Sequence, residues 1–102
     1  MKIIKKLSSY IESEIDDAEK YAKCALEYKD TEPNLSKLFY ALATEEMDHM
    51  SRLHKAVVDV IEEYREKNGE PPAQMQAVYD YLHTKHIEEA TEVKTMLTMY
   101  KE

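Results

Sequence analysis

Residues 38–53 read LFYALATEEMDHMSRL, and this stretch carries an apolar helical stripe that two polar side chains interrupt. The apolar members recur at steps of three and four, which places them on one helix face. They are Leu35, Leu38, Leu42, Leu53, Ala56 and Val60. Glu46 and His49 fall on the same face. An ionisable group facing a core is costly unless it is paired, hydrogen-bonded or bound to a metal, so this pair requires a physical explanation.

A metal ion is one explanation for Glu46 and His49. A carboxylate and an imidazole at positions i and i+3 point the same way, about one helical turn apart, which suits one transition metal ion or a di-iron pair. Glu-x-x-His alone is weak evidence, because the pattern occurs by chance on many solvated helix surfaces. The interpretation therefore depends on the rest of the chain.

The composition is that of one small, mostly helical domain, and we expect a single domain over residues 1–102. The formal net charge of −7 argues against nucleic-acid binding, since most of this surface would repel phosphates. No apolar run approaches the length that crosses a membrane. A lone Cys24 and the lack of a signal-peptide pattern favour a cytoplasmic protein.

Apolar periodicity predicts three long helices separated by two proline-containing turns. The helices are expected at about residues 3–29, 33–67 and 72–101. Pro33 suits the first turn of the second helix, and Gly69 suits the left-handed conformation that ends it. We therefore expect an all-α fold in which three long helices form an antiparallel up-down-up bundle.

The first helix carries one carboxylate on its apolar stripe. Glu14 lies on the stripe, whereas Glu12 and Asp16 are assigned to the flanks or the outer face. A glutamate at such a position often extends its carboxylate to solvent, which is the ordinary alternative to metal binding.

The third helix repeats the interruption in the reverse order, His-x-x-Glu. His86 and Glu89 occupy its apolar stripe, and His83 lies at the edge of that stripe. A histidine beside a carboxylate is often only a hydrogen-bonded pair. On the second helix, His54 leaves the face that carries His49, so we expect His54 to be a surface histidine.

The interruptions fall at similar heights, because distance from a connecting turn sets height along antiparallel helices. Glu14 lies about 15 residues before the end of the first helix, and Glu46 and His49 lie about 13 and 16 residues into the second. Glu89 lies about 17 residues into the third helix, with His86 about one turn away. These three carboxylates and two imidazoles suit iron or manganese, and also zinc.

The pattern of Glu14, Tyr21 and Ala25, followed by residues 38–49 with their Glu-x-x-His, resembles the ferritin-like superfamily. The similarity is to rubrerythrin-like and short encapsulated-ferritin-like proteins, and it covers roughly residues 10–60. It implies Glu14, Glu46 and His49 as ligands of a carboxylate-bridged di-iron centre that oxidises ferrous iron or reduces peroxide.

This chain has one Glu-x-x-His rather than two, three long helices rather than four, and no Cys-x-x-Cys module. Two arrangements would complete a di-iron site. In one, two chains pair and a two-fold axis supplies Glu14, Glu46 and His49 twice. In the other, the third helix adds His86 and Glu89 within one chain. The sequence does not decide between them.

Two classes of function follow from the sequence. The favoured one is a metal-binding ferritin-like protein with iron-oxidising or peroxide-reducing activity; the alternative is a non-catalytic structural or interaction bundle with a polar core and no metal. Catalysis is left open, because no electron donor or substrate channel is recognisable. We expect a homodimer or a higher homo-oligomer, because a three-helix ferritin-like chain lacks a fourth helix and the Tyr and Met residues suit an interface.

Overall fold

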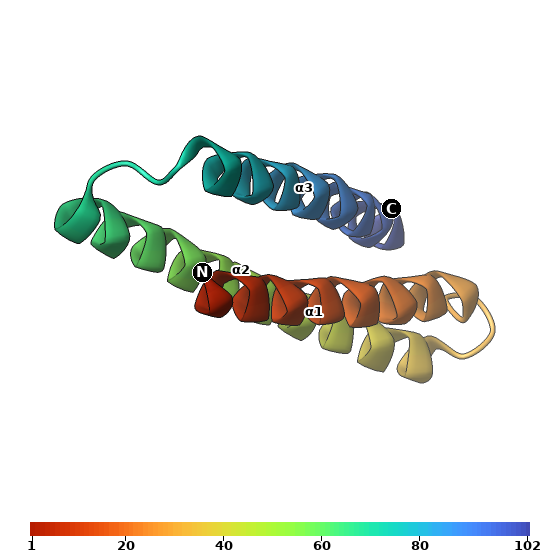
Figure 1. Cartoon of the computed structure of the whole chain (residues 1–102). Coiled ribbons are helices and arrows are strands. Elements are labelled where there is room, and N and C mark those ends of the chain that lie inside the picture. The colour runs from red at the N-terminus through yellow and green to blue at the C-terminus, as the bar shows by residue number, and fades with distance from the viewer.

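The computed structural model contains three helices joined by two short connections, and it contains no strand (Figure 1). Helix α1 spans Lys2–Glu27, α2 spans Pro33–Asn68 and α3 spans Ala73–Lys101. Each end lies within two residues of the position expected from the sequence. The prediction of an all-helical protein with three helices is confirmed. None of the helices is long and apolar enough to cross a membrane.

The two ends of α2 follow the predicted signals. Pro33 occupies the first turn, where a missing backbone N–H costs nothing. Gly69 follows the last turn with a φ of 79°, a conformation that side-chain-bearing residues rarely adopt. Its N–H donates a 2.9 Å hydrogen bond to the carbonyl of Arg65 and so satisfies one of the last carbonyls of α2.

Helix α1 lies between the other two helices and provides most of the core (Figure 1). Its buried residues recur at steps of three and four. They are Ile4, Ser8, Ile11, Ile15, Ala18, Ala22 and Ala25. Ala43 from α2 and Ala90 and Val93 from α3 complete the core cluster. In contrast, α2 and α3 contact each other little.

Contacts between α1 and α2 join residues late in one helix to residues early in the other. Tyr21 and Tyr28 both stack on Phe39, with ring centroids 6.2 and 6.3 Å apart. The hydroxyl of Ser36 donates a hydrogen bond to the carbonyl of Ala25. The result is visible in Figure 1, where α2 folds back beside α1 and extends past its N-terminal end.

The apolar stripe of α2 faces the core only in part, in contrast to the expectation from the sequence. Only Ser36 and Ala43 of the 36 residues in α2 are buried, and neither belongs to the stripe. Leu53 of the stripe packs against the core together with Met47, Met50 and Val57 from a neighbouring face. Leu35 and Leu38 are exposed, and the other stripe residues are half-buried, so a single chain leaves part of the stripe accessible.

A large-to-small substitution tests the central position of α1. Ile15 is 1% exposed, and Ile15→Ala should lower the free energy of unfolding by about 2–5 kcal/mol, because it removes buried methyl groups and leaves a cavity. The same substitution at the exposed Ile3 should change it by about 0.5 kcal/mol or less. Urea unfolding followed by circular dichroism measures both; equal losses would contradict this description of the core.

Candidate metal centre

Three of the predicted metal ligands come together on the α1–α2 side of the molecule. Glu14 from α1 and Glu46 and His49 from α2 each offer a ligand atom, and these atoms all lie within 4.8 Å of one another. The Nδ1 of His49 lies 3.4 Å from Glu14 Oε2 and 3.8 Å from Glu46 Oε2. One helical turn separates Glu46 from His49, and the packing of α1 on α2 brings Glu14 to the same level.

The environment of Glu14 fits a cation. Its Oε2 atom is buried and accepts no hydrogen bond, and its contact with His49 Nδ1 at 3.4 Å is an ion pair only when that histidine is protonated. Leaving a buried acceptor unsatisfied costs about 1–3 kcal/mol, and more for a charged group. A metal ion beside Glu14, Glu46 and His49 would remove that cost. Two carboxylates and one imidazole form a donor set that suits iron, manganese or zinc.

The group lies at the surface of a single chain. The side chain of His49 is 51% exposed, while those of Glu14 and Glu46 are partly buried. Glu46 and His49 lie between the half-buried Leu42 and Leu53 of the apolar stripe of α2. The third helix contributes no ligand atom to the group.

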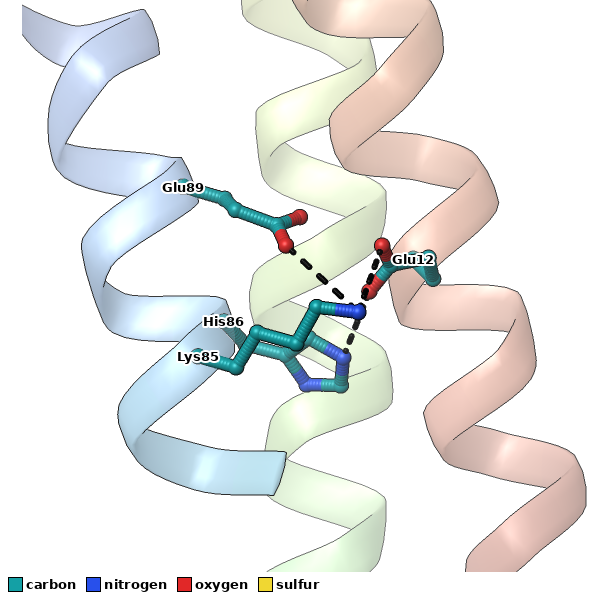
Figure 2. A network of polar contacts seen from close by, with 4 residues as sticks. All are labelled: Glu12, Lys85, His86 and Glu89. Atoms are coloured by element: carbon teal, nitrogen blue, oxygen red, sulfur yellow. Dashed lines mark hydrogen bonds and ion pairs between the residues drawn. The ribbon is translucent and has the colours of Figure 1, made fainter. Parts of the chain in front are cut away.

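His86 and Glu89 lie in a second group around Glu12 (Figure 2). His86 Nε2 is 3.1 Å from Glu12 Oε2. Lys85 Nζ is 3.3 Å from Glu12 Oε1 and 3.8 Å from Glu89 Oε1. Carboxylate oxygens of Glu12, Asp16 and Glu89 lie within 4.8 Å of one another. The five residues predicted as ligands are thus divided between two groups.

Helical geometry explains the division. Glu12 and Glu14 are two residues apart, so their side chains leave α1 about 200° apart around its axis. Glu14 faces α2 and Glu12 faces α3. Because α3 packs on the side of Glu12, its polar residues meet Glu12 and Asp16. From the sequence we expected both on the flanks or the outer face of the helix. Their i, i+4 spacing, which puts them on one side of α1, is the signal that could have indicated a shared site.

Comparison with known protein families agrees with this architecture. The family model for rubrerythrin matches residues 5–102. The chain belongs to the rubrerythrin family. The ferritin-like, rubrerythrin-type resemblance seen in the sequence is confirmed, and the match extends over α3 as well. Proteins of this family typically bind iron. No curated protein and no solved structure gave a significant match.

In this rubrerythrin-family chain, the second group already contains a cation. Burial raises the pKa of Glu89, and the nearby Glu12 carboxylate raises it further, while Lys85 opposes the change. Burial also lowers the pKa of His86, although Glu12 favours its charged form. Lys85 supplies positive charge between Glu12 and Glu89. A metal ion is therefore less needed here than beside Glu14.

His54 lies at the surface as a half-buried residue and has a partner that the sequence did not predict. Its Nε2 atom lies 3.0 Å from Nδ1 of the exposed His83 on α3. The two rings stack with centroids 4.9 Å apart. We expected His54 at the surface because it leaves the helix face that carries His49. That face packs near α1, whereas His54 lies on a side of α2 that α3 approaches.

Two substitutions of opposite sign test the second group in metal-free protein. Lys85→Gln should raise the pKa of Glu89, because the nearest cation is lost, and Glu12→Gln should lower it, because a like charge is lost. Carbon-detected NMR titration of the Glu89 side-chain carboxyl measures both shifts. Shifts of the same sign, or none, would contradict the network drawn in Figure 2.

Proposed function

We propose that this protein is a di-iron oxidoreductase whose metal centre is completed by a second copy of the chain. The observation that carries the proposal is the ligand group of Glu14, Glu46 and His49, which is partly buried and lies beside an apolar stripe of α2 that a single chain covers only in part. A group of three donors is half of what a di-iron centre requires, and the stripe is half of an interface.

Two-fold symmetry would supply the missing half of the ligand set and the missing half of the interface. A two-fold axis beside the stripe places two copies of the same surface against each other. The pair of chains then contributes two α1 and two α2 helices to a four-helix bundle, with Glu14, Glu46 and His49 each present twice. Four glutamates and two histidines, arranged as one Glu from each of two helices and one Glu-x-x-His from each of the others, is the ligand set of ferritin-like di-iron proteins.

Charge balance supports the same stoichiometry. Two ferrous ions carry four positive charges, and two copies each of Glu14 and Glu46 carry four negative charges. Charges that are removed from water are tolerated when they are paired, so a neutral set suits a closed interface. The two His49 side chains add neutral donors, since a histidine must be deprotonated at the ligating nitrogen to bind a metal.

The proposal includes the antiparallel up-down-up order of the three helices. It is supported by contacts such as Glu14 with His49 and Tyr28 with Phe39, in which one residue number falls as the other rises. The same trend links α2 to α3, where Tyr40 stacks on Tyr100 and Arg65 contacts Gln76. This order keeps Glu14 level with Glu46 and His49.

In function, His49 would hold iron through Nδ1 or Nε2, and Glu14 and Glu46 would act as terminal or bridging carboxylates. The bound iron would supply the redox chemistry, with ferrous iron or peroxide as the substrate. The second candidate is a structural bundle without metal, which would retain Glu46 and His49 as a polar pair. The unsatisfied Glu14 oxygen favours metal binding over that alternative.

Ligand substitutions separate the two candidates. Glu46→Gln and His49→Leu should each reduce iron content sharply, while Glu45→Gln, at the exposed neighbouring position, should not. At a metal concentration of 100 times the dissociation constant, binding stabilises the wild type by about 2.7 kcal/mol, and this gain should vanish in the two ligand variants. Metal analysis and melting temperature with iron or with chelator measure the effects.

The stability of the metal-free wild type and variants also separates the two candidate functions. If Glu46 and His49 bind metal, their removal should leave the metal-free protein equally stable or more stable, because an unsatisfied polar group is lost. If they are a structural pair, removing one should destabilise the protein by about 1–3 kcal/mol whether or not metal is present. That second result, with unchanged metal content, would reject the proposed centre.

Disrupting the stripe tests the dimer. Leu38 is 52% exposed, and Leu38→Glu should yield monomers that lose iron, because a charge would be buried in the interface. Met99 on α3 is 51% exposed, and Met99→Glu should leave both assembly and iron content unchanged. Sedimentation velocity and metal analysis measure both. A Leu38→Glu protein that stays dimeric and binds iron would contradict this interface.

A further inference from the structure

A histidine-lined space separates α2 from α3. Two adjoining cavities of about 180 and 250 Å³ lie here, and His54, His83 and His86 line both of them. The N-terminal half of α1 closes one side of this space, since Ile4, Ser8 and Ile11 line the first cavity and Ile11 also lines the second. Three of the four histidines of the chain border it.

The closest pair has a separation suited to a metal ion. His54 Nε2 and His83 Nδ1 face each other at 3.0 Å, so one nitrogen donates a proton and the other accepts it. With zinc–nitrogen bonds of about 2.0–2.1 Å and a tetrahedral angle, two ligating nitrogens lie about 3.3 Å apart. With a widening of about 0.3 Å, and with the donor ring carrying its proton on the other ring nitrogen, zinc would fit between the two facing nitrogens.

We propose that His54 and His83 form a second metal site, which binds a divalent transition metal ion such as Zn²⁺ between α2 and α3 and is separate from the proposed iron centre. An all-imidazole pair suits zinc, copper or nickel, whereas the carboxylate-rich group at Glu14 also suits the harder ions iron and manganese. The adjoining cavities leave room for water to complete the coordination.

The charge of the chain favours cation binding in general. The formal net charge of −7 attracts divalent cations to the surface.

His86 supports the pair from the next turn of α3. It lies three residues after His83, and its Nε2 atom is held by Glu12 (Figure 2). A carboxylate on one ring nitrogen fixes the tautomer and leaves the other nitrogen, Nδ1, as an acceptor. His86 thus keeps a third, uncharged imidazole beside the cavities. A metal at His54 and His83 would join two helices that otherwise contact each other little.

Zinc titration of metal-free, full-length protein tests the site, using competition with a chromophoric chelator to count equivalents. His54→Gln and His83→Gln should each lower the affinity of one zinc equivalent per chain at least tenfold. His49→Gln is the matched control, since it removes a histidine from the proposed iron centre and should leave this equivalent in place. The result does not depend on that iron centre, whose occupancy is read separately as iron content.

A ligand-replacing variant guards against loss of folding. His83→Cys should retain zinc, because a thiolate is also a good zinc ligand, and with Co²⁺ it should show a sulfur-to-metal charge-transfer band that the wild type lacks. Zinc affinity in His83→Gln equal to that of the wild type would overturn the proposal. Absence of zinc binding to the wild type at micromolar concentration would also overturn it, as would a folded His83→Cys protein without the cobalt band.

Discussion

The packing of α1 against α2 through small buried side chains is the constraint on which the rest of the structure depends. Ala18, Ala22 and Ala25 of α1 are buried and Ala43 of α2 joins the same core, so the two helices can approach closely. This packing sets Glu14 level with Glu46 and His49. It also determines which face of α2 turns inward. Leu35 and Leu38 of the predicted stripe stay exposed on a single chain, and the dimer that we propose would cover them.

Local signals in the sequence predicted the helices well, since the residues that begin and end them act within one turn. Pro33 and Gly69 are examples, and the apolar periodicity was sufficient to indicate three long helices. The level of Glu14 with Glu46 and His49 was also predictable, because a short connection fixes height along paired helices. The rotation of each helix about its own axis was not. The face of α2 that packs on the core carries Ala43, Met47, Met50, Leu53 and Val57. This second apolar series shares Leu53 with the predicted stripe, and periodicity alone does not rank two overlapping series.

The position of His86 and Glu89 was not predictable for a similar reason. Their height along α3 was close to that of Glu14, but α3 packs on the side of α1 that carries Glu12. Height along a bundle follows from counting residues; the side of a central helix that a third helix occupies depends on packing over its whole length. His54 is a further example, since its partner His83 lies on α3, 29 residues later in the sequence. Residues on α3 therefore serve a separate polar network, while the iron centre that we propose relies on α1 and α2.

Assembly and chemistry are linked in this account, because the interface and the metal centre are completed by the same two-fold operation. Iron binding would then stabilise the dimer by mass action, and dimerisation would raise the affinity for iron. Native mass spectrometry of the iron-loaded protein tests this claim most directly, since it reports the number of chains and of iron ions in the same particle. We expect dimers, or multiples of dimers, that carry two iron ions per pair of chains, together with monomers that carry none. Monomers that retain iron at one or two ions per chain would contradict it.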